Sequence, residues 1–424
     1  MKTTQKWSAW KLEECCDIID SRRIPVNSED REKRIGDIPY YGANGLQGYI
    51  NDFIFDEPLI LIAEDGGRFD EFATKPIAYR IEGKSWVNNH AHVLRSKAGF
   101  SQDAIFYALE HKDIQPFIVG GTRSKLNQSA LRSIVIELPE NEPEQSKIAE
   151  VLSKVDQAIE QTEQLIAKQQ RIKTGLMQDL LTRGIDEHGN IRSEETHEFK
   201  DSPLGRIPVE WEVKPFNDCV SIVEGQKDPR KFPYKEWILI APDHIESKTG
   251  RLLETKTAFE QGAISGKYEF QSGDVIYSKI RPYLRKAVQV NFSGLCSADM
   301  YPLRPKELLT SDFLFLVILS EKFSLYAESV SERSGFPKIN RTELSEFQMA
   351  IPKIDEQYKV SDFLVGHSQY VEELNKSLAK LRSLKTALMQ DLLTGKVRVT
   401  PLMEKNGQNS EKNFKKECCY VCKE

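Results

Sequence analysis

The sequence predicts a mixed α/β protein with two variable domains, each followed by one long α-helix. Three observations predict this fold class. A ten-residue segment, KTGLMQDLLT at 173–182, returns as KTALMQDLLT at 385–394. Apolar side chains precede each copy at three- and four-residue steps, which is typical of a helix with one apolar face. The preceding segments contain short β-rich runs separated by Gly, Asn and Asp turns.

The repeat extends far beyond these ten residues. With a constant offset of 212 it reaches back to Glu144 and Glu356, and 17 of the 39 paired positions are identical. Further upstream, KLNQSALRSIVIELP at 125–139 resembles KINRTELSEFQMAIP at 338–352. A whole module of about 200 residues is therefore duplicated, a period too long for a solenoid.

The helical parts of the module are expected at 140–184 and 353–396. Neither 39-residue copy contains a proline, and Gly184 and Gly395 follow as expected C-cap residues. The apolar spacing fits a seven-residue repeat, which predicts two helices of about 60 Å forming an antiparallel coiled coil about a pseudo-twofold axis. His367 interrupts the apolar seam, and we expect it to be a hydrogen-bonded packing residue without chemistry.

The rest of the chain divides around these helices. The variable domains are expected at 1–139 and 207–352, both mixed α/β. A polar, Gly- and Pro-punctuated linker joins the two modules at 185–206, and 397–424 is expected to be a disordered tail.

Composition limits the classes of function and the cellular compartment. Lys and Arg (59) against Asp and Glu (64) leave a formal charge of −5, which argues against a polybasic protein that coats nucleic acid. The sequence shows neither a signal-peptide pattern nor a long apolar run, and seven cysteines without regular spacing do not form a disulfide framework. We therefore expect a cytoplasmic protein without a membrane partner.

Basic, polar loops are the candidate DNA-binding elements. The segment 279–286 holds four cations and one tyrosine without an acid, and 122–128 and 338–341 are similarly polar and basic. Lys and Arg suit phosphate contacts, while Arg and Asn suit contacts with base edges. A solvated loop is the alternative for each segment alone. The candidate residues are Arg123, Lys125, Asn127, Lys279, Arg281, Tyr283, Arg285, Lys338, Asn340 and Arg341. For the paired positions Lys125/Lys338 and Asn127/Asn340, the alternative is that they fix a shared loop to the helix.

Motifs for catalysis are almost absent from the sequence. It contains neither an ATP-binding GxxxxGK[ST] loop nor the NPPY or DPPY tetrapeptide of amino-methyltransferases. Asp243, Glu246 and Lys248 resemble a metal-dependent nuclease motif, but the first acid lies too close to the others. His90 and His92 offer two metal ligands without a recognisable third. We therefore predict neither catalytic nor metal-binding residues, although a nuclease with an unrecognised metal site and a coiled-coil scaffold remain alternatives.

The arrangement resembles the specificity subunit of type I restriction–modification systems. Each variable domain ends in a KxN segment, then an EQxK helix finishes in KTxLMQDLLT. PxxW at 208–211 opens the second half, and GDVIYSKIRPYLRKA occupies 273–287. The resemblance covers residues 7 to about 396.

This resemblance implies a function and a set of partners. Each variable domain would be a target-recognition domain that reads one half of a bipartite sequence in double-stranded DNA. The helices would set the half-site spacing and dock two methylation subunits, with two restriction subunits where the system has them. Methylation at adenine N6 would occur in those partners, which would also carry the cofactors S-adenosylmethionine, ATP and Mg²⁺. This chain would hold no cofactor and would not itself be an enzyme.

Overall fold

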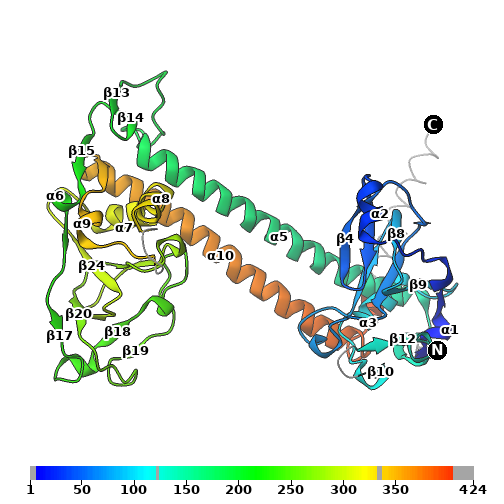
Figure 1. Ribbon diagram of the computed structural model, residues 1–424. Coiled ribbons are helices and arrows are strands. Elements are labelled where there is room, and N and C mark those ends of the chain that lie inside the picture. Colours follow the sequence, from blue (N-terminus) through cyan, green and yellow to red (C-terminus); the bar gives the residue numbers. More distant parts are fainter. Residues whose placement is uncertain (1–5, 121–123, 332–336, 404–424) are drawn as a thin grey trace, which may run out of the picture. The chain divides into compact units, whose positions relative to one another are not determined.

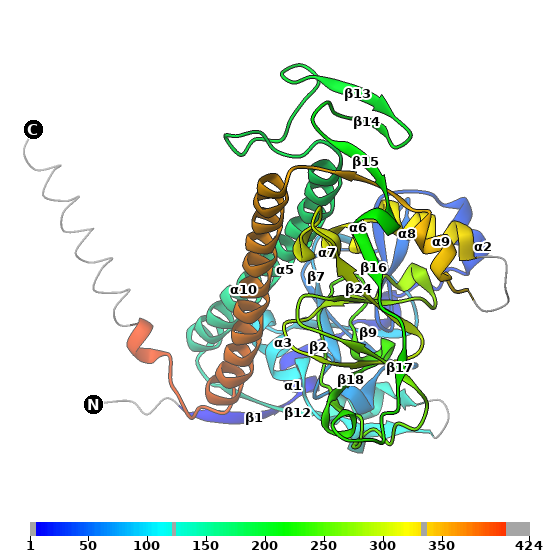
Figure 2. The same ribbon diagram turned by 90° about the vertical axis from the view of Figure 1, so that its left-hand side faces the viewer.

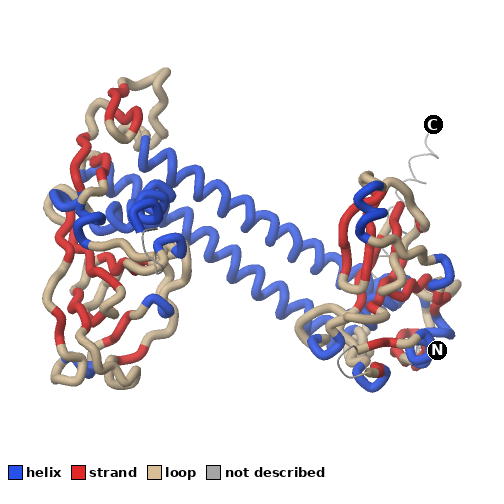
Figure 3. Tube along the Cα trace, viewed as in Figure 1, coloured by secondary structure: helices blue, strands red, loops and turns tan. Residues whose placement is uncertain are grey.

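The computed structural model describes residues 6–120, 124–331 and 337–403. The chain divides into two compact units. Met1–Glu163 and Lys376–Glu424 form unit 1, and Gln164–Asn375 forms unit 2. Figures 1 and 3 show that the strands gather within the two units, whereas two long helices run from one unit into the other.

Unit 1 contains two four-stranded sheets. Their orders are β2-β9-β6-β7, which is antiparallel throughout, and β4-β3-β8-β5, in which β3 and β8 run parallel. Two short pairs, β1-β12 and β10-β11, complete its strands. The strands are β1 (Trp7–Lys11), β2 (Cys16–Ile18), β3 (Ile38–Gly42), β4 (Gly45–Ile50), β5 (Phe55–Asp56), β6 (Leu59–Ala63), β7 (Ala78–Ile81), β8 (Lys84–Val87), β9 (Ala91–Ser96), β10 (Ile118–Val119), β11 (Lys125–Leu126) and β12 (Val135–Pro139).

Short helices cover and connect these strands. The longest of them is α3, which begins at an N-cap serine, Ser101. The helices are α1 (Leu12–Cys15), η1 (Asp20–Arg22), α2 (Ser28–Lys33), η2 (Phe69–Glu71), α3 (Gln102–Glu110), η3 (Gln115–Phe117) and α4 (Gln128–Ser133).

Unit 2 repeats the four-stranded antiparallel sheet as β16-β24-β21-β22 and replaces the second sheet by the five-stranded order β17-β20-β23-β18-β19. The pairs β13-β14 and β15-β25 complete it. The strands are β13 (Phe199–Ser202), β14 (Gly205–Pro208), β15 (Glu212–Pro215), β16 (Val220–Ile222), β17 (Gln226–Lys227), β18 (Ile238–Ile240), β19 (Lys256–Thr257), β20 (Lys267–Phe270), β21 (Val275–Ser278), β22 (Ala287–Gln289), β23 (Gly294–Cys296), β24 (Met300–Pro305) and β25 (Gln348–Ile351).

The helices of unit 2 follow the same plan. The apolar stretch at 311–330 forms two helices, because the chain turns to an extended conformation at Ser320. The helices are α6 (Phe216–Cys219), η4 (Tyr234–Glu236), η5 (Pro242–His244), η6 (Pro282–Leu284), α7 (Ser311–Leu319), α8 (Glu321–Ser331) and α9 (Arg341–Ser345). Matching sheet orders and matching helices confirm the internal repeat and the mixed α/β class.

The two long helices are α5 (Glu142–Thr182) and α10 (Ile354–Leu392). At 1.5 Å per residue, each has a length of about 60 Å. Both glycines expected at their C-terminal ends have the left-handed backbone of a C-cap residue, with φ of 64° at Gly184 and 71° at Gly395.

Within each unit, α5 and α10 run antiparallel. In unit 1, Arg382 pairs with Glu163 at 2.6 Å, and Lys385, further along α10, pairs with Asp156, earlier in α5, at 2.8 Å. In unit 2, His367 Nε2 lies 3.0 Å from the backbone carbonyl of Gln169. His367 is therefore the hydrogen-bonded packing residue that its place in the apolar seam predicts. The helices lie side by side in both views (Figures 1 and 2).

Each unit has a core to which both long helices contribute. In unit 1, Ile148 and Leu152 of α5 and Leu392 of α10 pack among the buried residues of the first variable domain. In unit 2, Leu180 of α5 and Leu364 of α10 pack in the same way against the second. The apolar stripe of each helix therefore covers two cores and a partner helix, which accounts for its length.

The linker and the beginning of the tail both contain ordered structure. The linker at 185–206 contains β13 and the start of β14, and its Arg192 is buried. The tail predicted to be disordered from residue 397 is ordered as far as Met403, because Arg398 pairs with buried Glu144 and Val399 packs in the core of unit 1. Residues 404–424 lie outside the described residues. None of the described helices has the length and apolar character needed to span a bilayer.

Candidate nucleic-acid interface

The antiparallel sheets β2-β9-β6-β7 of unit 1 and β16-β24-β21-β22 of unit 2 end in equivalent hydrogen bonds. In unit 1, the Glu64 amide donates to His90 O at 2.8 Å, and the Leu126 amide donates to Glu64 O at 2.8 Å. In unit 2, the Lys279 amide donates to Asp299 O at 3.0 Å, and the Ile339 amide donates to Lys279 O at 3.0 Å. Glu64 and Lys279 therefore occupy equivalent positions, one residue beyond β6 and β21 respectively.

This equivalence places both KxN segments at the same edge of their domain. Isolated β-bridges join Asp65 to Lys125 in unit 1 and Ile280 to Lys338 in unit 2. In unit 2, the structure thus brings together the two basic segments predicted from the sequence, 279–286 and 338–341. They lie about 50 residues apart in the chain.

The loop between β21 and β22 has an unusual backbone. Arg281 and Arg285 flank η6 with a φ of 48° each, and Lys248 on a neighbouring loop has a φ of 67°. They are the only non-glycine residues with positive φ in the part of the chain that the structure describes. A left-handed backbone costs a residue with a Cβ roughly 1–2 kcal/mol, and such strain gathers at functional sites. All three strained residues are cations.

Hydrogen bonds connect these strained residues to adjacent loops. The Lys248 amide donates to Arg285 O at 3.3 Å, and the Arg281 amide donates to Pro337 O at 2.9 Å. Tyr283, on η6 between the two arginines, is 49% exposed. Three loops therefore present cations and one exposed aromatic ring at one edge of unit 2, which suits contact with phosphates and bases.

Two of the predicted contact residues make hydrogen bonds within their own domain. The Arg341 guanidinium donates to the carbonyls of Ile222 and Val223 at 3.0 and 2.7 Å and lies 4.8 Å over the Tyr301 ring. The Asn340 side chain accepts the Glu343 amide at 2.9 Å and caps α9. These side chains hold the KxN segment to its domain.

The corresponding residues in unit 1 differ in their partners. Lys125 forms an ion pair with Glu64 at 3.1 Å, whereas Asn127 is exposed at the N-cap of α4 and makes no capping hydrogen bond with its side chain. Arg123 lies outside the described residues. The η2 loop of unit 1, which corresponds to η6, presents Arg68 at the same N-cap position as Arg281, and Arg68 is exposed.

A buried ionic cluster lies beneath the KxN segment of unit 1. His92 Nδ1 lies 2.6 Å from Asp20 Oδ2, and its Nε2 lies 2.7 Å from Leu126 O. Burial alone would raise the pKa of Asp20, but hydrogen bonds from His92 and the Val93 amide outweigh burial and hold the pKa of that carboxyl below its ordinary value.

Asp20, Glu64 and His92 are the only metal-like cluster among the described residues, but they do not suit a metal ion. Both ring nitrogens of His92 are occupied by hydrogen bonds, and Glu64 already pairs with Arg23 at 2.8 Å and with Lys125. Arg23 and Lys125 occupy the place that a metal ion would take, so the cluster is a structural ion-pair network. His90, considered with His92 from the sequence, pairs separately with Asp65.

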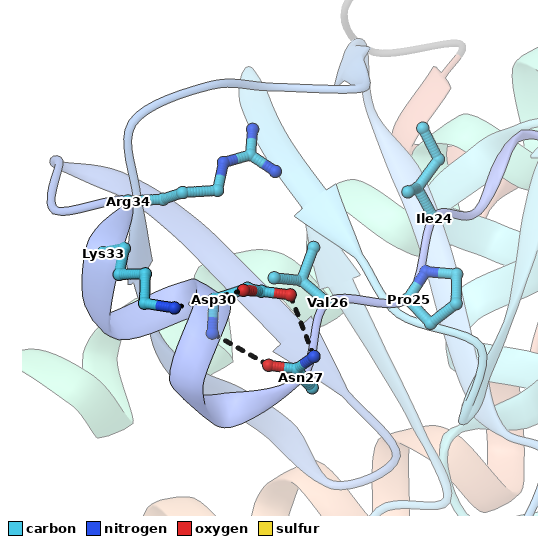
Figure 4. Close-up of a pocket in the computed structure, with 7 residues that line it drawn as sticks. All are labelled: Ile24, Pro25, Val26, Asn27, Asp30, Lys33 and Arg34. Carbon is cyan, nitrogen blue, oxygen red and sulfur yellow. Dashed lines mark hydrogen bonds and ion pairs between the residues drawn. The ribbon is translucent and has the colours of Figure 1, made fainter.

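A hollow of about 400 Å³ lies beside α2 in unit 1 (Figure 4). Asn27 caps α2 by accepting the Asp30 amide at 2.8 Å, and the Arg34 guanidinium lies 4.4 Å over the Trp86 ring. No titratable cluster or convergent set of donors marks the hollow as a ligand site in the described residues, and we assign no ligand to it. Its lining consists of Ile24, Pro25, Val26, Asn27, Asp30, Lys33 and Arg34.

Comparison with known proteins identifies the family. The family described as "Type I restriction modification DNA specificity domain" matches residues 4–169 and 208–382, which together form most of the chain. The chain belongs to this specificity family. DNA sequence recognition is therefore its function, and its partners are DNA and the other subunits of a type I complex.

Individual relatives agree with this membership. The chain is 28% identical to the type I restriction enzyme EcoDI specificity subunit of Escherichia coli over 420 residues, covering 92% of this chain and 88% of that protein. Its fold is similar to a crystal structure of the S subunit from M. genitalium, with a TM-score of 0.60, 14% identity and coverage of 92% and 97%.

A second solved structure is titled for complex assembly and conformational transition of the type I R-M system. It matches with a TM-score of 0.52 and 15% identity, over 93% of this chain and 99% of that one. At such identities, both structural matches show the fold.

In this specificity subunit, Lys248 is a further contact candidate, which lies outside the basic segments of the sequence. Read with Asp243 and Glu246, it resembles a nuclease motif. The structure instead ties Glu246 to Arg251 at 2.8 Å and leaves the Asp243 side chain 83% exposed. The turn signal SKTG, ending in Gly250 with a φ of 74°, marks the loop, but no sequence signal gives its neighbours.

Proposed function

We propose that each unit reads one half of a bipartite DNA target and that the two halves differ. The observation that carries this proposal is the matched pair of loops after β6 and β21. Equivalent hydrogen bonds hold them, yet one begins Glu64-Asp65-Gly66 and the other Lys279-Ile280-Arg281. The same scaffold with different side chains is what two readers of different sequences require.

In unit 2, the contacts with DNA would come from the edge formed by the three loops. Lys279, Arg281 and Lys338 are suited to phosphates or guanine edges, and exposed Tyr283 is suited to stacking or a sugar contact. Arg285 pairs with Glu321 at 3.8 Å and is set aside for that reason. In unit 1, Arg123, Asn127 and Arg68 are the corresponding candidates, since Lys125 is already paired with Glu64.

The long helices would set the distance between half-sites and dock the methylation subunits. Each helix runs without interruption from one unit into the other. We propose two methylation subunits for each copy of this chain, with two restriction subunits where the system includes them. Methyl transfer to adenine N6 and its cofactor S-adenosylmethionine would belong to the methylation subunits, as would ATP and Mg²⁺ to the restriction subunits.

Binding of duplex DNA at increasing salt tests the proposal. The chain assembled with its methylation subunits should bind a duplex with an affinity that falls steeply as salt rises, because phosphate contacts release counterions. A complex that binds no duplex at low salt would contradict the proposal and favour the scaffold alternative. Mg²⁺-dependent cleavage by the isolated chain, abolished by Asp243→Ala, would favour the nuclease alternative.

A further inference from the structure

Glu64 and Lys279 occupy the same position of the repeated scaffold but carry opposite charges. In unit 1, Glu64 neutralises Lys125 of the KxN segment at 3.1 Å. In unit 2, the same two positions hold Lys279 and Lys338. The ion pair of one unit is thus a pair of like charges in the other.

Within the described part of unit 2, Lys279 and Lys338 differ from Glu64 and Lys125 in having no ion-pair partner. Among the residues that the structure describes, no carboxylate lies within ion-pair distance of the Lys279 or the Lys338 ammonium group. Lys279 is held over the Tyr301 ring at 5.0 Å, which orients its ammonium group without neutralising it. Lys338 is exposed on the KxN segment.

Two lysines at neighbouring backbone positions, with no carboxylate of the described residues paired to either, favour an external anion. Like charges in proximity raise the free energy of the folded protein, and an anion that contacts both removes that cost. Lysine suits a phosphate because its ammonium group is a point charge with three rotatable donors. The strained cation Lys248 is on an adjoining loop, and Arg285, on the same loop as Lys279, pairs with Glu321 at 3.8 Å.

We propose that Lys279 and Lys338 together bind a backbone phosphate of the DNA, and that the equivalent position of unit 1 binds none. This inference rests on the proposed function. In unit 1, Glu64 already neutralises Lys125, and Arg23, His92 and Asp20 complete the network of ion pairs around it. Unit 2 therefore contributes more to the salt-dependent part of DNA affinity at this position than unit 1.

Matched substitutions test this asymmetry in the complex with methylation subunits. The affinity for a duplex is measured over a range of salt, with the target sequence and with an unrelated sequence. Lys279→Gln and Lys338→Gln should each weaken binding to both duplexes and lower the slope of log affinity against log salt by about one. Lys125→Gln, the matched control in unit 1, should leave the slope unchanged.

A charge reversal separates binding from folding. Lys279→Glu places the acid of unit 1 opposite Lys338, so it should weaken DNA binding more than Lys279→Gln. Its thermal midpoint should be equal to or above that of the wild type. A loss of folding stability in Lys279→Glu that accounts for the lost binding would overturn the inference.

Different outcomes of these measurements would overturn the phosphate site and the proposed function. Unchanged slopes in Lys279→Gln and Lys338→Gln, with a steep slope in the wild-type complex, would overturn the phosphate site alone. An equal loss of slope in Lys125→Gln would overturn the asymmetry. If Lys279→Gln instead dissociates the methylation subunits in size-exclusion chromatography, the anion is an acidic protein surface and the proposal is wrong.

Discussion

Arg398 donates two hydrogen bonds, each 2.7 Å long, to the fully buried carboxylate of Glu144. The interaction is repeated in unit 2, where buried Arg192 donates to both carboxylate oxygens of Glu356. Glu144 and Glu356 are paired positions of the sequence repeat. In each unit, the segment that follows one long helix is therefore fixed to the beginning of the other.

Removal of Arg398 should destabilise unit 1. Arg398→Ala leaves a buried carboxylate without its partner, which costs about 3 kcal/mol of unfolding free energy. Urea unfolding followed by tryptophan fluorescence measures this loss, since Trp7 lies against Gly395 at the same junction. Arg192→Ala is the matched control in unit 2 and should cost a similar amount. An unchanged midpoint in Arg398→Ala would show that the pair does not hold the junction.

The two asparagines of the KxN segments should differ in their contribution to stability. Asn340→Ala removes a capping hydrogen bond of α9 and should cost about 1 kcal/mol. Asn127→Ala removes no such bond at α4 and should cost at most a few tenths of that value. Chemical denaturation of the two variants gives both values. Equal losses would mean that the caps do not distinguish the repeats.

The Arg341 side chain should matter for folding more than for DNA affinity. Its guanidinium bonds to two carbonyls and covers Tyr301, so Arg341→Ala should lower the unfolding free energy by about 2 kcal/mol. Arg341→Lys retains the charge but not the paired hydrogen bonds and should recover only part of the loss. A variant with wild-type stability and reduced DNA affinity would return Arg341 to the set of DNA contacts.

The stability of unit 1 should depend on the ionisation of Asp20. The pKa of this carboxyl is lower in the folded protein than its ordinary value of 3.8, so the stabilisation is present above about pH 4 and is lost as pH falls through the lower, folded-state pKa. Asp20→Asn lacks this contribution. Unfolding at several pH values should show a difference between wild type and Asp20→Asn that narrows as pH falls below about 4. A difference independent of pH would contradict the assignment.

The length of the helices should set the spacing of the half-sites. One heptad inserted after Glu163 in α5 and another after Asn375 in α10 preserves the apolar seam and lengthens both helices by about 10 Å, or about three base pairs at 3.4 Å per step. Methylation mapping should give the same half-sites with a longer spacer. Altered half-sites, or an unaltered spacer, would contradict the division between reading domains and helical spacer.

Much of the fold follows from the sequence because its signals are local and repeated. The heptad pattern predicts both helices, and Gly184 and Gly395 mark their ends. The ordered beginning of the tail does not follow from the sequence, since Arg398 follows Gly395 by three residues whereas Arg192 follows Gly184 by eight. Because the loops differ in length, the sequence does not show that Arg398 and Arg192 are equivalent. The structure shows it, since Arg398 bonds to Glu144 and Arg192 bonds to Glu356.

The candidate site was less predictable because its partners are distant in sequence. The basic character of 279–286 and 338–341 is visible in the sequence, but their proximity depends on β-bridging between Ile280 and Lys338. Nothing local indicates that Glu64 neutralises Lys125 or that Arg341 faces inward. Residue type alone therefore does not separate candidate DNA contacts from side chains, such as Arg341, that bond within their own domain.

Mapping of methylated adenines in DNA from cells that express this chain with its methylation subunits shows whether each unit reads its own half-site. We expect one bipartite, asymmetric motif: two short specified halves separated by a spacer of fixed length and unspecified sequence. Exchange of the unit 2 variable domain, 207–352, should change one half only. A continuous motif, or a change in both halves after that exchange, would contradict the claim that each unit reads its own half-site.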